Sequence, residues 1–139
     1  MHNFIFIFLV FLSSFVYSNE IEILSDIPGD GLKIEEHFKL KVNYRGFLED
    51  GTEFDNSYKK NQPFEFQYGL RQVIDGWEIG LEGMKIGGKR KIKIPPNLAY
   101  GKNGVGDLIP PNSTLIFEVE LMDIKDDHNH DHSDPNHTH

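Results

Sequence analysis

The side chains that most enzymes use as nucleophiles or bases are scarce in this chain. It contains no cysteine, and His37 is the only histidine between residues 19 and 125. Neither a Cys–His nor a Ser–His–Asp arrangement therefore has a credible base. The segment GKNGVG lacks the strand–loop–helix context of a phosphate-binding loop, and no paired carboxylates stand out. Any chemistry must come from apolar surface and a few polar groups.

Aromatic side chains occupy positions that a packed sheet does not require. Trp77, the only tryptophan, lies in the segment QVIDGWEIGLEGM, which also contains three glycines. Phe54 precedes Asp55 just before a loop, and Tyr100 lies in a glycine-rich loop, although loops usually stay at the surface. Two interpretations remain open: these rings are ordinary core, or they line one cavity that an apolar group enters.

Alternating apolar residues predict the strands that would position these rings. Residues 38–44 alternate apolar and polar side chains, as in a half-buried strand. The same pattern recurs in residues 64–68, 89–94 and 114–124. Asp50-Gly51 is a strong hairpin signal after the first of these strands.

One short helix is predicted around Trp77. Asp75 is suited to cap its start, and Glu78, three residues later, completes a capping-box pattern. Trp77 and Leu81 stand four residues apart and share a face, and Gly83 favours the end of the helix. The predicted fold class is α+β: a twisted antiparallel sheet of four or five strands with one short helix packed on its concave face.

Both ends of the chain are predicted to lie outside this domain, which spans residues 19–125. Residues 1–18 are apolar and carry no Lys, Arg, Asp or Glu, which indicates a secretory signal peptide; an uncleaved membrane anchor is the alternative. A signal peptide of this kind predicts that the protein is exported to a bacterial periplasm or, in a eukaryote, to the secretory pathway and endoplasmic reticulum lumen. Residues 126–139 form a His- and Asp-rich tail that cannot pack. Histidines ligate zinc, nickel or copper, so weak divalent metal binding and a simply solvated acidic tail both remain open.

The segments VNYRGFLEDGTEFDNS, QPFEFQYG, QVIDGWEIGLEGMKIGGKRKIKIPPNLAYG and IPPNSTLIFEVELMDI resemble the FKBP-type peptidyl-prolyl cis/trans isomerases. The resemblance runs from about Gly29 to Ile124, with the segments in the family's order and spacing. It implies an antiparallel sheet of about five strands wrapped on one helix. It also implies that Trp77 is the floor of an apolar pocket.

The resemblance implies a role for each matching residue. Tyr100 matches a hydroxyl that donates to a bound carbonyl, the Ile74 amide matches a second donor, and Asp55 matches a buried polar residue at the pocket edge. Lys60 stands where arginine is frequent, so a looser ion pair with Asp55 is expected. The expected catalytic residues are Tyr44, Phe54, Asp55, Tyr100 and Phe117, and the expected substrate-binding residues are Phe64, Val73, Ile74, Trp77, Leu108 and Ile109.

The implied activity is rotation about X–Pro bonds during the folding of exported proteins, with no cofactor and no metal in the site. The implied partners are X–Pro polypeptides and, by family likeness, macrolide inhibitors, and we expect a monomer. The formal net charge of −8 argues against a nucleic-acid partner. Two alternatives are a binding module that captures proline-containing or hydrophobic segments with little turnover, and a secreted metal-binding protein acting through its tail.

Overall fold

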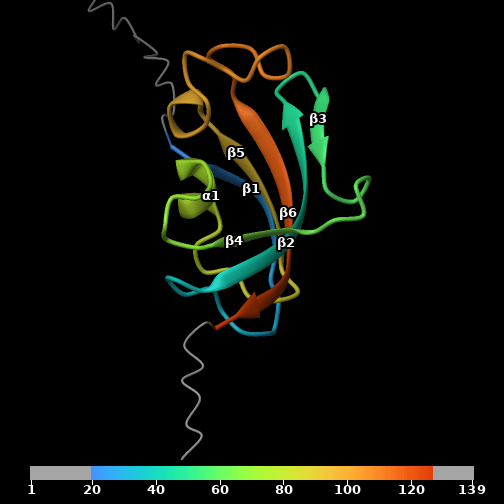
Figure 1. Ribbon diagram of the computed structural model, residues 1–139, viewed down its shortest axis with the longest axis vertical. Helices are drawn as coiled ribbons and strands as arrows, with labels where there is room; N and C mark the ends of the chain where they lie inside the picture. The colour runs from blue at the N-terminus through green and yellow to red at the C-terminus, as the bar shows by residue number, and fades with distance from the viewer. Residues whose placement is uncertain (1–19, 127–139) are drawn as a thin grey trace, which may run out of the picture.

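The computed structural model describes residues 20–126. The predicted signal peptide and all but the first residue of the predicted tail lie outside the described residues. The described chain forms a twisted antiparallel sheet with one short helix on its concave side (Figure 1). In chain order the elements are β1 (Glu22–Ile27), β2 (Lys39–Leu48), β3 (Glu53–Asn56), β4 (Phe64–Gln67), α1 (Asp75–Gly80), β5 (Lys89–Ile94), a 3₁₀ turn (Pro96–Leu98) and β6 (Leu115–Lys125).

The sheet has six strands, in the order β1-β5-β6-β2-β3, with β4 pairing beside β3 on the same edge of β2. The predicted fold class is confirmed, but the predicted count of four or five strands is too low. The clearest omission is β1, which pairs with β5 at the edge of the sheet and is exposed at all six positions. An exposed edge strand shows no alternation of apolar and polar residues, so its sequence carries no periodic signal.

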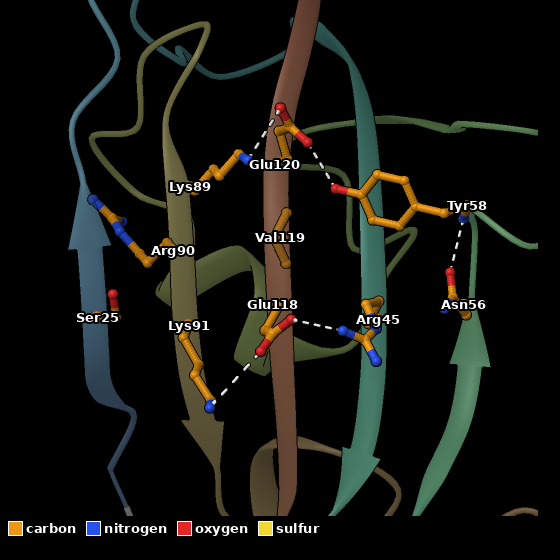
Figure 2. Close-up of a pocket in the computed structure, with 10 residues that line it drawn as sticks. All are labelled: Ser25, Arg45, Asn56, Tyr58, Lys89, Arg90, Lys91, Glu118, Val119 and Glu120. Atoms are coloured by element: carbon orange, nitrogen blue, oxygen red, sulfur yellow. Dashed lines mark hydrogen bonds and ion pairs between the residues drawn. The ribbon is translucent and has the colours of Figure 1, made fainter.

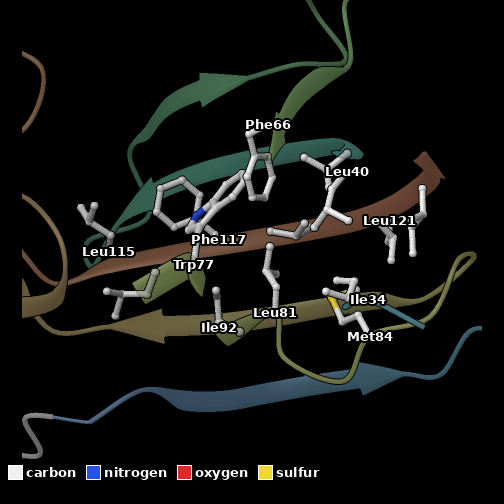
Figure 3. Packing of buried hydrophobic residues seen from close by; sticks show 14 of the residues in the cluster. Ile34, Leu40, Phe66, Trp77, Leu81, Met84, Ile92, Leu115, Phe117 and Leu121 are labelled. Carbon is white, nitrogen blue, oxygen red and sulfur yellow. The ribbon is translucent and has the colours of Figure 1, made fainter. Parts of the chain in front are cut away.

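A single hydrophobic core fills the concave side of the sheet, between β2, β5, β6 and α1 (Figure 3). Every strand position that alternation predicts to face inward in β5 and β6 is buried. Fully or almost fully buried side chains include Leu40, Val42, Ile92, Ile94, Leu115 and Leu121.

The helix α1 lies close to the sheet because two of its glycines, Gly76 and Gly80, face strand β5. A methyl group added at Gly76 would come within 2.4 Å of Ile94 Cγ2, and one added at Gly80 within 2.8 Å of Ile92 Cδ1. Both distances are far below van der Waals contact. The glycines beside Trp77 thus let the helix backbone approach β5, and the one large side chain of the helix fills the space toward the neighbouring strands.

Both predicted ends of the helix are wrong. Ile74 is the N-cap, and no side chain caps the helix. The Glu78 carboxylate instead accepts hydrogen bonds from the backbone amides of Gly69, at 2.8 Å, and Arg71, at 3.1 Å. Glu78 therefore fixes the preceding turn rather than the first turn of the helix. The helix ends at Gly80, and Gly83, with φ of +80°, lies in the turn that follows.

The convex face of the sheet carries rows of opposite charge (Figure 2). Lys91 and Arg45 lie on either side of Glu118, with nitrogen–oxygen distances of 3.8 and 3.7 Å. Glu120 accepts a hydrogen bond of 2.7 Å from the Tyr58 hydroxyl. These groups border a broad depression of about 600 Å³. Because the ion pairs are exposed, they contribute little to stability.

The described part of the chain contains no helix with the length and apolar character needed to cross a membrane.

Candidate functional site

A smaller cavity of about 390 Å³ lies on the concave side, next to the start of α1. Seven segments of the chain converge on it: β2, β3, β4, the turn that leads into α1, α1 itself, the loop after the 3₁₀ turn, and β6. Its lining is mostly aromatic and aliphatic, and consists of Tyr44, Phe54, Asp55, Phe64, Arg71, Gln72, Val73, Ile74, Trp77, Tyr100 and Phe117.

The aromatic rings of the site pack edge to face around Trp77. The indole centroid lies 5.2 Å from the Tyr44 ring and 5.3 Å from the Phe117 ring, with interplanar angles of 82° and 88°. Phe66 and Phe64 contact it from β4 at 5.7 and 6.1 Å. Edge-to-face pairs are favourable beyond their buried area, so these contacts lock the orientation of the indole. Trp77 is only 4% exposed, yet it lines the cavity.

The indole nitrogen of Trp77 is the only buried side-chain nitrogen or oxygen of residues 20–126 that lacks a hydrogen-bond partner. An unpaired polar group in an apolar environment is costly. The Phe117 ring lies perpendicular to the indole, with the two centroids 5.3 Å apart (Figure 3).

Asp55 forms the polar edge of the cavity. Its carboxylate accepts a hydrogen bond from the Tyr44 hydroxyl and forms an ion pair of 2.6 Å with Lys60 Nζ. Burial opposes ionisation, but the hydrogen bonds from Lys60 and Tyr44 outweigh it and hold the pKa of Asp55 below its usual value. Burial and the Asp55 carboxylate raise the pKa of Tyr44, which therefore stays protonated as the donor. The Lys60 side chain is 61% exposed, and the expectation that this pair is looser than one with arginine stays a prediction.

Two hydrogen-bond donors at the cavity have no acceptor within the described residues. One is the hydroxyl of Tyr100, whose side chain borders the cavity and whose pKa is raised by burial and by the charge of Asp55. The other is the backbone amide of Ile74, which precedes the first hydrogen-bonded turn of α1. Both are therefore available to a carbonyl group that enters the cavity.

The structure brings most of the expected site residues together. All five expected catalytic residues and four of the six expected substrate-binding residues line the cavity. Leu108 and Ile109 do not line it: Leu108 is 52% exposed, and Ile109 is buried in the core and bridges to Val105. Arg71 and Gln72 line the cavity but were not predicted. Their position immediately before Val73 and Ile74 was the available signal, because one tight turn places all four residues at the same edge.

Comparison with known proteins places this geometry in a family. The family model for FKBP-type peptidyl-prolyl cis-trans isomerases matches residues 31–122. A Debaryomyces hansenii protein named FK506-binding protein 2 is 46% identical over 129 residues, which is 90% of this chain and 95% of the relative. The Saccharomyces cerevisiae peptidyl-prolyl cis-trans isomerase FPR2 is 43% identical over 87% of this chain and 95% of its own length.

Solved structures share the fold. The crystal structure of AtFKBP13 superposes with a TM-score of 0.69 at 36% identity, and the match covers 76% of this chain and 91% of that one. The crystal structure of FkpA from Escherichia coli gives a TM-score of 0.66 at 50% identity, but the match covers only 47% of the FkpA chain.

Proposed function

The chain belongs to the family of FKBP-type peptidyl-prolyl cis-trans isomerases, and we propose that it binds and rotates X–Pro bonds in the cavity floored by Trp77. The observation that carries the proposal is the combination in one place of an apolar cavity of about 390 Å³ and two unpaired donors, the Tyr100 hydroxyl and the Ile74 amide.

The apolar lining favours the twisted state of the bond over the planar one. Resonance makes the planar amide polar and sets a rotation barrier of about 18–20 kcal/mol. The twisted transition state has lost this conjugation and is less charge-separated. Aromatic walls such as Phe54 and Phe117, which replace water around the bond, therefore disfavour the ground state relative to the transition state. Each tenfold gain in rate requires about 1.4 kcal/mol of such differential stabilisation.

The polar groups hold the substrate while the bond turns. Tyr100 and the Ile74 amide donate to carbonyl groups that flank the rotating bond, which fixes one side of the substrate. Phe64 and Val73 contact the chain at the mouth of the cavity. No covalent step is needed, so the scarcity of nucleophiles is no obstacle. Asp55 is ionised and holds the Tyr44 ring and Lys60 in place, and we assign it no proton transfer.

The test is the rate of cis-to-trans conversion of a short X–Pro peptide with the purified protein. Uncatalysed conversion takes tens to hundreds of seconds, so acceleration is easily measured. Phe54→Ala removes one cavity wall and should lower kcat/KM about tenfold or more. Phe47→Ala is the matched control, since Phe47 lies on β2 outside the cavity, stacked with Arg45 at 4.9 Å. Equal losses in the two variants, at equal stability, would disprove this placement of the site.

Several relatives carry the name FK506-binding protein, and we propose that FK506 occupies the same cavity here. The drug should then inhibit the peptide reaction competitively. If inhibition is absent or noncompetitive, the drug does not share the peptide's cavity. The binding-module alternative predicts peptide binding without acceleration, which the same assay separates.

We also propose that the protein is exported and acts on exported polypeptides. Matching relatives occur in yeasts and in the bacterium Neisseria meningitidis, and the uncharged apolar start of this chain supports the proposal. N-terminal sequencing of the protein from its host should begin at residue 19. A start at Met1 in the cytosolic fraction would overturn it. Metal binding by the tail stays a prediction, because the tail lies outside the described residues.

A further inference from the structure

A second depression adjoins the cavity on the β4 side, with a volume of about 460 Å³. Tyr44 and Phe64 line both spaces, so these two rings, whose centroids lie 6.1 Å apart, form the boundary between them. The lining beyond the rings is polar and includes Lys60, Gln62 and Glu65. A polypeptide that leaves the apolar cavity past Phe64 would enter this polar space.

The second depression offers unused hydrogen-bond donors. The side-chain amide of Gln62 has no hydrogen-bond partner within the described residues. The one hydrogen bond that Gln62 makes there is donated by its backbone amide to the Ser57 carbonyl. Lys60 Nζ has three donors, and only Asp55 accepts from it. Acceptor groups of a ligand would therefore find free N–H groups here.

Lys60 and Glu65 are the charged residues that line the second depression. The Glu65 carboxylate is already paired with Lys39 at 3.3 Å and with Lys125 at 3.8 Å. Asp55 is paired with Lys60. Lys60, which keeps N–H groups free, is therefore the cation that a ligand meets in this depression. An acidic group suits this site, and a basic group does not.

We propose that the second depression is a subsite for the residue flanking the X–Pro pair, and that it selects substrates with an aspartate or glutamate there. The proposal rests on the function proposed above for the neighbouring cavity. An extended chain advances about 3.3 Å per residue, so a residue two positions from the proline lies about 7 Å away. The two spaces share Tyr44 and Phe64 as lining, so such a residue can reach the second depression. Lys60 and Gln62 are the specificity-determining residues. Gln62 is the one to substitute, because Lys60 also pairs with Asp55.

The experiment compares matched X–Pro peptides that carry Glu, Gln or Lys at one flanking position, scanned on both sides of the proline. At low ionic strength kcat/KM should follow the order Glu, Gln, Lys on one side only. The Glu peptide should exceed the Gln peptide by about two- to fivefold, the size of effect that exposed ion pairs support. The advantage should shrink at high salt, because salt screens exposed charges.

The variant Gln62→Glu should abolish or reverse the preference for the Glu peptide over the Lys peptide. Ser25→Glu is the matched control, since it adds the same charge on β1, at the opposite edge of the sheet. Equal rates for the Glu, Gln and Lys peptides at every position would overturn the subsite, as would a preference that Gln62→Glu leaves intact. No acceleration of any peptide, including the uncharged one, would instead reject the function proposed for the cavity.

Discussion

The close approach of α1 to β5 makes Gly76→Ala the most informative single change in the fold. The new Cβ would meet Ile94 at 2.4 Å from Cγ2, 2.7 Å from Cδ1 and 3.0 Å from Cγ1. These atoms are branched and belong to a fully buried side chain, so they cannot rotate away without displacing other core atoms. The helix must therefore move off the sheet, and Trp77 and the Ile74 amide move with it.

Two opposing effects set the size of the change in stability. Overpacking a core typically costs about 1–3 kcal/mol, and replacing a helical glycine by alanine gains about 1 kcal/mol. The free energy of unfolding of Gly76→Ala should therefore fall by about 0–2 kcal/mol. In an Ile94→Ala background the obstructing atoms are gone, and the same substitution should raise it by up to about 1 kcal/mol. The coupling in this double-mutant cycle should be about 1–3 kcal/mol.

Urea unfolding of the four proteins measures this cycle. With slopes of about 1–3 kcal/mol/M, each 1 kcal/mol moves the midpoint by about 0.3–1 M. Ile79→Ala is the control, because Ile79 lies on the same helix but is exposed, so it reports helix propensity without the clash. The kcat/KM of Gly76→Ala for peptide isomerisation should also fall by more than the fraction of unfolded protein explains, because Trp77 and the Ile74 amide move with the helix. A stabilising Gly76→Ala with no coupling to Ile94 would refute the reasoning.

Three further predictions follow from the cavity. Tyr100→Phe should leave stability unchanged within about 0.5 kcal/mol, since the hydroxyl has no partner among the described residues, and should lower kcat/KM by about three- to tenfold; full activity would remove Tyr100 from the donors. The pKa of Asp55 is lowered in the folded protein because the hydrogen bonds from Lys60 and Tyr44 outweigh burial; its contribution to stability is therefore present above the unfolded pKa of about 3.9 and is lost as pH falls through the folded value. Acid titration of unfolding in the wild type and in Asp55→Asn should show a difference that vanishes at low pH, and a constant difference would contradict the assignment. Because Trp77 is the only tryptophan, binding of an X–Pro peptide or FK506 should change the intrinsic fluorescence, and a ligand that binds without any change would place it elsewhere.

Much of the fold could be predicted because its strands are half-buried. Leu40 and Val42 in β2, and Ile92 and Ile94 in β5, alternate with polar residues that are only partly buried, and this periodicity appears directly in the sequence. The strand β1 could not be predicted in this way, since pairing with β5 rather than burial defines it. Local pattern also misled at the helix start. Glu78 fits a capping box, but tertiary structure gave its carboxylate the amides of the preceding turn.

The candidate site was predictable through motifs and much less through chemistry. The resemblance identified nine residues that line the cavity, but residue types alone left Trp77 open as core or pocket floor; in the structure it is buried and also lines the cavity. Leu108 and Ile109 were carried over by position in a loop whose path the sequence does not define. The resemblance also named the Tyr100 hydroxyl and the Ile74 amide as donors, but that neither has a partner within residues 20–126 follows only from the three-dimensional structure.

The pairing of β2 with β6 has a consequence for how this protein is made. These strands join residues 39–48 to residues 115–125 at the centre of the sheet, so the centre of the sheet cannot form until residues 115–125 have been synthesised. Contacts between distant parts of a chain form slowly and leave apolar segments uncovered in the meantime. During synthesis from the N-terminus, the apolar side of β2 therefore stays without its partner strand until β6 is available, and an isomerase domain of this kind is itself exposed to misfolding while it is made.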